Sequence, residues 1–173
     1  MISKKMTASL NTHMNLELFS AHLYLSMSSS ANTLGLKGAA NWFMVQYHEE
    51  MVHFMKFYTY LIDQGENITL NASKSVPNSY KSLLEMFEKT LAHEQLITKC
   101  INELSEQAVQ EKDHATQIFL QWFITEQIEE ENNDRDMIAK LKLVGDNGYG
   151  ILMIDGEMAQ RIFTPPPSSS AGN

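Results

Sequence analysis

The chain has 173 residues, and its 21 acidic residues outnumber its 13 basic ones, which gives a formal net charge of −8. This balance argues against a nucleic-acid-binding surface and suits a protein that attracts cations. No apolar run approaches the roughly 20 residues that a membrane-spanning helix needs, so we expect no membrane association. The single cysteine, Cys100, cannot form an internal disulfide, so we expect a reducing compartment, the cytoplasm.

Four long segments repeat apolar residues at the spacing of an amphipathic helix. They cover approximately residues 5–33, 39–64, 80–109 and 113–143. Gly35 and Gly38 mark a turn after the first segment, and Gly65 is a natural end for the second. A shorter fifth helix is expected over residues 151–163. No segment alternates with the period of a β-strand, so the pattern predicts an all-α four-helix bundle.

The link between the second and third helices, residues 66–79, is long for a compact domain. Its residues can reach roughly 46 Å when extended, whereas a helix of about 26 residues measures roughly 39 Å. The link can therefore cross the full length of a helix pair. We expect residues 1–163 to form one domain and the Pro/Ser-rich residues 164–173 to form a flexible tail.

Each long segment carries a glutamate at a position that the pattern assigns to the core. Measured along the helices from the nearest turn, the heights of Glu17, Glu50, Glu94 and Glu130 agree to within about one turn. His53 follows Glu50 by three residues, so both side chains lie on one face of a helix. We expect the five side chains to meet near the middle of the bundle.

Four glutamates in an apolar core cannot all stay ionised without a counter-charge, because burial and mutual repulsion favour protonation. No arginine or lysine lies on the inner stripes near them, so a metal is the expected counter-charge. Carboxylates with one imidazole and no thiolate favour iron or manganese over structural zinc. The set suits two divalent ions bridged by a carboxylate, and Glu50 is the expected bridge because it lies beside His53.

A wider set of motifs resembles a prokaryotic non-haem ferritin. The matching segments are Met14-Asn15-Leu16-Glu17-Leu18, Tyr24, Glu50-Met51-Val52-His53, Glu94-Gln95-Leu96-Ile97-Thr98 and Phe119-Leu120-Gln121-Trp122-Phe123-Ile124-Thr125-Glu126-Gln127-Ile128-Glu129-Glu130-Glu131. The similarity covers residues 1 to about 160. It implies a ferritin-like four-helix bundle with a long crossover and a short fifth helix, assembled into a 24-subunit shell around an iron mineral.

The same resemblance implies roles for individual residues. The first iron would bind Glu17, Glu50 and His53, and the second would bind Glu50, Glu94 and Glu130. A third, transit iron site would use Glu49, Glu126, Glu129 and Glu130. Tyr24 and Gln127 would line the centre, and Trp122 would lie nearby. The implied reaction is ferroxidation, in which Fe(II) is oxidised to Fe(III) by dioxygen or hydrogen peroxide.

Two positions separate the chain from related di-iron families. Bacterioferritins and di-iron oxygenases use a second Glu-x-x-His on the fourth helix, whereas this chain has Gln127-Ile128-Glu129-Glu130 there. Val52 stands where bacterioferritins keep the methionine that ligates haem, so we predict no haem. Ile128 stands where the family commonly has a histidine that is not a direct iron ligand, and its effect on the third site stays open.

Several of these residues also have a simpler interpretation. Glu126, Glu129 and Glu131 can form a solvated acidic face, while Tyr24 and Trp122 can act as packing residues. Cys100 is expected to be buried and inert. We expect the remaining histidines at the surface or at its boundary, namely His13, His22, His48, His93 and His114.

Three other functions remain open. A di-iron oxygenase or peroxidase would need an open pocket and would be monomeric or dimeric, which gel filtration can distinguish from a shell. A mini-ferritin that protects DNA binds iron between subunits and lacks the fifth helix expected at residues 151–163. A bundle that uses its glutamates only for assembly or passive metal storage would not oxidise Fe(II).

Overall fold

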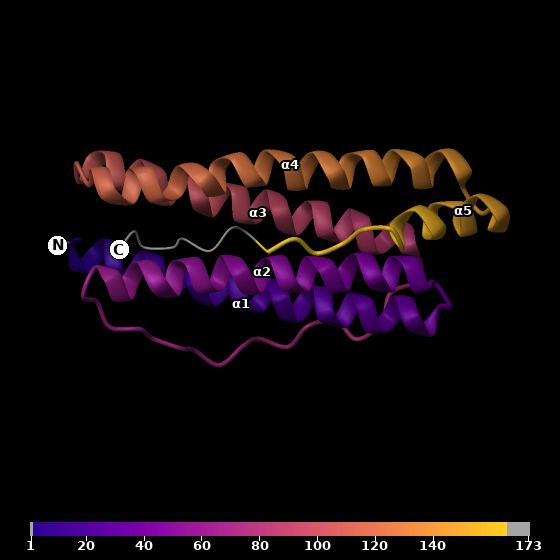
Figure 1. Cartoon of the computed structure of the whole chain (residues 1–173), viewed down its shortest axis with the longest axis horizontal. Helices are drawn as coiled ribbons and strands as arrows, with labels where there is room; N and C mark the ends of the chain where they lie inside the picture. Colours follow the sequence, from indigo (N-terminus) through magenta and orange to yellow (C-terminus); the bar gives the residue numbers. More distant parts are fainter. Residues whose placement is uncertain (1, 166–173) are drawn as a thin grey trace.

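The computed structural model describes residues 2–165, and five helices account for most of that range. They are α1 (Lys4–Thr33), α2 (Lys37–Asp63), α3 (Leu83–Gln110), α4 (His114–Val144) and α5 (Gly148–Met158). The α1/α2 and α3/α4 hairpins pack side by side as a four-helix bundle, which confirms the predicted all-α architecture (Figure 1). Within the described residues, no helix is long and apolar enough to cross a membrane. Most of the predicted tail, residues 164–173, lies outside the described range.

The segment between α2 and α3 runs along the outer side of the α1/α2 hairpin, so α2 and α3 point in the same direction (Figure 1). Two asparagines of α1 hold this segment by its backbone. Asn11 donates to the carbonyl of Asn67 at 3.1 Å and accepts from the amide of Thr69 at 2.7 Å. One turn later, Asn15 donates to the carbonyl of Thr69 and accepts from the amide of Asn71. These bonds satisfy loop backbone groups that have no helix or sheet partner.

Two hydrophobic clusters fill the bundle, one toward each end. The first contains Tyr24, Met27, Phe43, Phe87 and Met137. The second contains Met14, Phe57, Ile97, Leu120 and Phe123. Along every long helix the two clusters leave a gap, and the four predicted glutamates fall in these gaps. The polar layer is therefore enclosed between apolar layers, which limits its access to water.

The fifth helix is shorter and begins earlier than the predicted range of residues 151–163. It starts at Gly148 because the side chain of Asn147 accepts a hydrogen bond from the amide of Gly150 at 3.1 Å. It ends at Met158, whose carbonyl accepts from the side chain of Asn41 on α2 at 3.3 Å. The periodic pattern beyond Met158 does not continue the helix, and residues 161–165 have no regular secondary structure.

The beginning of α2 is completed by a side chain from α5. Leu36, the N-cap residue of α2, makes no capping hydrogen bond through its side chain. Asp155 Oδ1 accepts instead from the amide of Ala39 at 2.8 Å. A Cβ atom at Gly38 would lie 1.6 Å from the carbonyl oxygen of Asp155, so only glycine permits this approach. The contact fixes α5 against the start of α2.

We expect Asp155→Ala to lower the free energy of unfolding by about 1 kcal/mol, because it removes a helix cap. Asp146→Ala is the matched control, since Asp146 is exposed in the turn before α5. Thermal unfolding of both variants checks this expectation. Equal midpoints for the two variants would show that the Asp155 cap contributes nothing.

Candidate metal centre

The four long helices each place one carboxylate in the enclosed polar layer. Glu17, Glu50, Glu94 and Glu130 are exposed by 0%, 1%, 1% and 7%, and His53 by 3%. Ligand atoms of Glu17, Glu50 and His53 lie within 4.8 Å of one another, and so do those of Glu50, Glu94 and Glu130. The structure thus brings together all five predicted ligands. Glu50 belongs to both groups, in the position expected of a bridge between two metal ions.

Neighbouring side chains orient the carboxylates by hydrogen bonds. The Tyr24 hydroxyl donates to Glu94 Oε1, and Gln127 Nε2 donates to Glu94 Oε2 at 3.0 Å. Gln46 Nε2 donates to Glu130 Oε1 at 3.0 Å. Tyr24 and Gln127 therefore lie beside these carboxylates, the place that the resemblance implied for them, whereas Gln46 carried no such signal in the sequence. Such outer hydrogen bonds fix the direction in which a ligand presents its oxygen atoms.

Two of the four buried glutamates keep oxygen atoms without hydrogen-bond partners. Among the described residues, Glu130 Oε2 and Glu17 Oε2 have no hydrogen-bond partner. Leaving a buried acceptor unsatisfied costs roughly 1–3 kcal/mol, and more for a charged group. A divalent cation bound by these oxygens would remove that cost. The donor set of carboxylates and one imidazole fits iron, which takes oxygen and nitrogen ligands.

Burial and crowding change the protonation of this layer. Burial raises the pKa of Glu50 and of Glu130 well above the usual range of a carboxyl group, and the charge of Glu94 raises both further. Burial, followed by Glu94, raises the pKa of Asp134 to about 8. Burial in the metal-free centre therefore favours the protonated form of these carboxyl groups. A cation that binds to the carboxylates competes with their protons, so metal binding is coupled to proton release.

His13 is buried, which corrects the expectation that it lies at the surface. It is 3% exposed, and its Nε2 lies 2.7 Å from Glu17 Oε1 as an ion pair. Burial lowers the pKa of His13, but the charge of Glu17 and the interactions with Glu17 and Cys100 together outweigh burial and bring the pKa to about 9. In return, His13 holds the pKa of Glu17 below its usual value despite burial. The spacing of four residues on one helix was the signal that identifies this pair.

Cys100 and the remaining histidines are less buried than His13. Cys100 is only half-buried, which corrects the prediction of a buried cysteine. The remaining four histidines are half-buried or exposed, as predicted, namely His22, His48, His93 and His114.

The residues of the expected third site are only partly brought together. Glu126 forms a group with His53 and Glu130, within the same 4.8 Å limit. Glu49 is instead ion-paired at 2.6 Å with Arg161, from the segment after α5, and Glu129 is exposed. The helical pattern places no cation near the centre, because the position of Arg161 depends on how the segment after α5 folds back.

Trp122 lies beside the centre, where the sequence analysis expected it. Its ring meets the His53 ring edge-on at 5.3 Å between centroids. Lys56 Nζ lies over the Trp122 ring, 4.1 Å from its centroid. Trp122 therefore packs directly against a predicted metal ligand.

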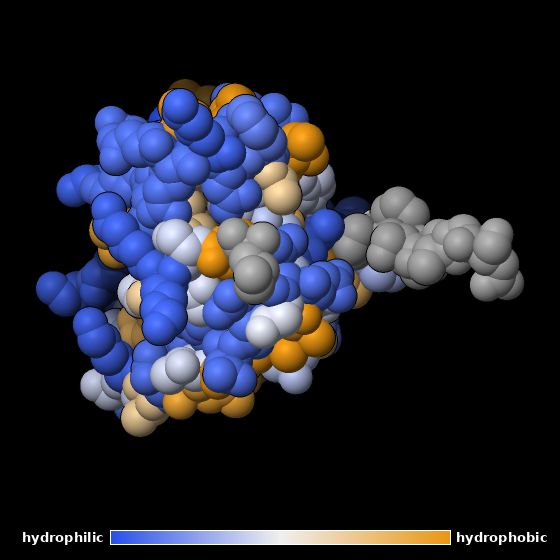
Figure 2. Space-filling view, turned by 90° about the vertical axis from the view of Figure 1, so that its left-hand side faces the viewer, coloured by the Kyte–Doolittle hydropathy of each residue, from blue (hydrophilic) through white to orange (hydrophobic). Residues whose placement is uncertain are grey.

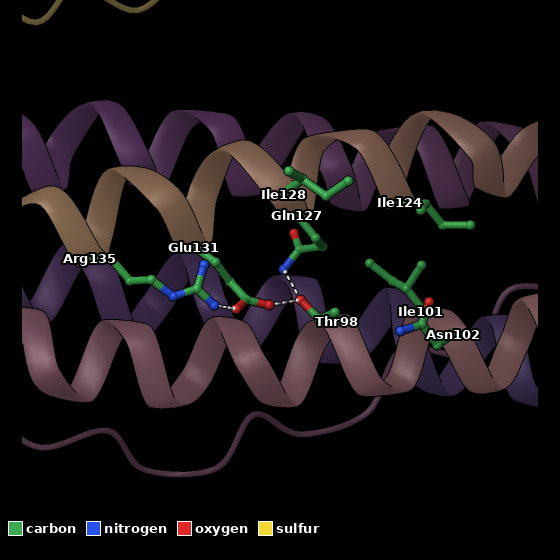
Figure 3. A pocket seen from close by; sticks show the side chains of 8 residues that line it. All are labelled: Thr98, Ile101, Asn102, Ile124, Gln127, Ile128, Glu131 and Arg135. Atoms are coloured by element: carbon green, nitrogen blue, oxygen red, sulfur yellow. Dashed lines mark hydrogen bonds and ion pairs between the residues drawn. The ribbon is translucent and has the colours of Figure 1, made fainter.

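A cavity of about 270 Å³ opens between α3 and α4 beside the centre. Figure 3 shows Gln127, Thr98 and Glu131 directed toward one another in this cavity. Gln127 Nε2 donates to Thr98 Oγ1 at 3.3 Å, and that hydroxyl donates to Glu131 at 2.7 Å. Ile128 lines the same cavity and is 69% exposed. The residue that departs from the family pattern thus lies outside the ligand groups.

Comparison with known proteins identifies the family. The ferritin-like domain family matches residues 7–144. The chain is 42% identical over 155 residues to the bacterial non-heme ferritin of Campylobacter jejuni, which covers 90% of this chain and 93% of that protein. The chain belongs to the bacterial non-heme ferritin family. The ferritin of Escherichia coli is 41% identical over 159 residues, covering 92% of this chain and 96% of that protein.

Solved ferritin structures agree with this assignment. The open-pore ferritin of Archaeoglobus fulgidus superposes with a TM-score of 0.93 at 43% identity, covering 94% of this chain and 100% of that one. An engineered closed form of the same ferritin also gives a TM-score of 0.93, at 44% identity. The ferritin fold, and a function in iron storage and ferroxidation, are thereby confirmed.

We expect the stability of the metal-free ferritin to fall as pH rises from about 6 to about 8. Asp134 has a pKa of about 8 in the folded protein, above its ordinary value of 3.8, so the folded state binds the proton more tightly. Raising the pH removes that advantage. His13 has a pKa of about 9 in the folded protein, so the stability that it contributes is also lost as the pH rises. Calorimetry over this pH range measures the slope.

The matched pair for this measurement is Asp134→Asn and Asp136→Asn. Asp134 is buried, whereas Asp136 is exposed on the same helix. Asp134→Asn should reduce the dependence of stability on pH, and Asp136→Asn should leave it unchanged. The same slope in both variants would refute the role of Asp134.

Proposed function

We propose that each subunit binds two Fe(II) ions in this layer as substrates for oxidation. One ion would bind Glu17, Glu50 and His53, and the other Glu50, Glu94 and Glu130. The observation that carries the proposal is that two groups of buried ligands share a single carboxylate. A shared carboxylate holds two ions close enough to react together with one molecule of oxidant.

The chemistry follows from the charges of the ligands. Each Fe(II) gives up one electron, and two electrons with two protons convert dioxygen into hydrogen peroxide. Hydrogen peroxide can also serve as the oxidant, and two further electrons and protons reduce it to water. Anionic oxygens stabilise a triply charged ion more than a doubly charged one, so the carboxylates favour the Fe(III) product. The buried acids that lose protons when iron binds lie beside the reacting ions.

The proposal includes storage of the Fe(III) product as a mineral inside a shell of 24 subunits in the cytoplasm. The isolated subunit has large hydrophobic side chains that a shell would cover, with exposed fractions of 70% for Ile118, 89% for Leu143 and 75% for Tyr149. Figure 2 shows that the end of the bundle where α2 and α3 finish is mostly hydrophilic, with small hydrophobic patches. Contacts between subunits would remove the exposed apolar side chains from water, which favours assembly.

Glu50→Ala and His53→Ala should each slow the fast phase of Fe(II) oxidation by more than about tenfold, because each removes a predicted ligand. Stopped-flow absorbance under air measures the rate, and gel filtration shows whether the shell still assembles. Glu106→Ala on the exposed face of α3 is the control. Wild-type rates in both ligand variants would refute the site, and a wild-type protein with no fast phase would indicate passive storage.

We further propose a third iron position at the edge of the pair, with Glu49, Glu126, Glu129 and Glu130 as ligands. The proximity of Glu126 to Glu130 and His53 supports it. Glu49 would have to exchange Arg161 for the metal, and Glu129 would have to turn inward from its exposed position.

Glu126→Ala should reduce the Fe(II) bound per subunit from three ions to two and leave fast oxidation of the first two ions intact. Anaerobic equilibrium titration of Fe(II) counts the ions. Glu129→Ala and Glu49→Ala should give the same loss if these residues are ligands. Three ions bound in all three variants would rule out the third position.

A further inference from the structure

The chain after α5 turns back and lies along α2 (Figure 1). Asn41 on α2 donates to the carbonyl of Arg161 at 2.9 Å, in addition to its bond to Met158. Two residues later, the Phe163 ring lies 5.3 Å from the ring of His48. We call residues 159–163 the return segment. Its attachment at two points fixes the backbone from which the Arg161 side chain extends.

The Arg161 side chain makes three contacts with one face of α2. Its guanidinium lies 4.3 Å from the centroid of the Trp42 ring, a cation–π contact. Its Nη1 donates to Gln46 Oε1 at 2.9 Å, and its Nη2 is paired with Glu49 at 2.6 Å. The pair is only partly exposed, by 19% for Arg161 and 27% for Glu49. A planar guanidinium suits this arrangement, because it can donate to two groups in fixed directions.

Gln46 connects this contact to the metal centre. It is 6% exposed, and both ends of its amide are engaged. Its oxygen accepts from Arg161, while its nitrogen donates to Glu130 Oε1 at 3.0 Å and lies 3.5 Å from Glu50 Oε1. The amide therefore has one orientation, with its acceptor toward the cation and its donor toward the carboxylates.

We propose that Arg161 is a positioning residue for the second of the two metal positions and that it acts through Gln46. This inference rests on the proposed function, which assigns Glu50, Glu94 and Glu130 to that position. Arg161 restrains the Gln46 side chain and polarises its amide, which strengthens the hydrogen bond to Glu130. The preorganised carboxylate then binds metal with a smaller loss of conformational entropy.

The contacts predict a larger effect on the second metal position than on the first. Gln46 donates to Glu130, which belongs to the second position and not to the first, and its longer 3.5 Å bond reaches Glu50, which both positions share. None of its hydrogen bonds reaches Glu17 or His53. A purely structural role for the return segment would instead change both metal affinities together, or change thermal stability alone. The two roles therefore differ in how they affect the first and the second metal.

Anaerobic calorimetric titration of the assembled, metal-free protein with Zn(II) tests the proposal without turnover. Zn(II) is redox-inert, so it reports binding alone. His53→Ala and Glu130→Ala identify the first and second binding events by removing each in turn. Arg161→Met, which keeps an apolar stem over Trp42, should weaken the second event by about tenfold and leave the first within about twofold. Arg161→Lys should recover part of the loss.

A double-mutant cycle tests the route through Gln46. Gln46→Leu should weaken the second event as much as Arg161→Met does, and the double variant should lose no more than either single one. Lys140→Met is the control, because Lys140 pairs with Glu157 on α5 and makes no contact with Gln46. If Arg161→Met does not assemble, Arg161→Lys and Gln46→Leu give the same comparison.

The outcomes separate this inference from the proposed function. Failure of the wild-type protein to bind two Zn(II) ions per subunit at these ligands would overturn the proposed function. Two ions in the wild type, with an unchanged second affinity in Arg161→Met, would overturn only the role of Arg161. Equal losses at both positions, or additive losses in the double variant, would also overturn it.

Discussion

The burial of four carboxylates at the middle of the bundle is the constraint on which the rest of the structure depends. Each group would be ionised in water, yet each is almost completely enclosed between two hydrophobic clusters. In the metal-free protein, burial and mutual repulsion raise the pKa of Glu50 and Glu130, and a cation is needed to hold them ionised. In the proposed function, the same unfavourable burial is the source of the affinity for Fe(II).

The surrounding structure keeps this layer closed and in register. The long link lies along the α1/α2 hairpin and allows α2 and α3 to run in parallel, which brings Glu50 and Glu94 to the same height. The cap from Asp155 and the approach at Gly38 fix α5 against α2. That attachment in turn directs the return segment toward Gln46. Elements far apart in the sequence therefore act on the same carboxylates through a few specific hydrogen bonds.

Much of the centre could be predicted from the sequence, because its determinants are periodic. Glu17, Glu50, Glu94 and Glu130 occupy core positions of amphipathic helices, and their heights follow from a constant rise per residue. The spacing of Glu50 and His53 identifies the face they share. The lengths of the long helices and the path of the link followed from the same arithmetic.

The remaining features depend on contacts that periodicity does not encode. Arg161 reaches Gln46 and Glu49 only because the fifth helix ends at Met158, five residues earlier than its pattern indicated. That end depends on a side chain of α2, Asn41, more than 100 residues away. The sequence carries a local signal for the ion pair of His13, because His13 lies four residues before Glu17. A single histidine is usually exposed, however, so this signal alone does not predict that His13 is buried. Long-range capping and pairing decide these positions.

An anaerobic Fe(II) soak of crystals, followed by anomalous diffraction at the iron edge, tests the central claim most directly. Two iron peaks are expected in each subunit, roughly 3.5–4 Å apart, with Glu50 between them and Glu17 and Glu130 on opposite sides. Iron found only on the outer or inner surface of the assembly, with the four glutamates left uncoordinated, would contradict it.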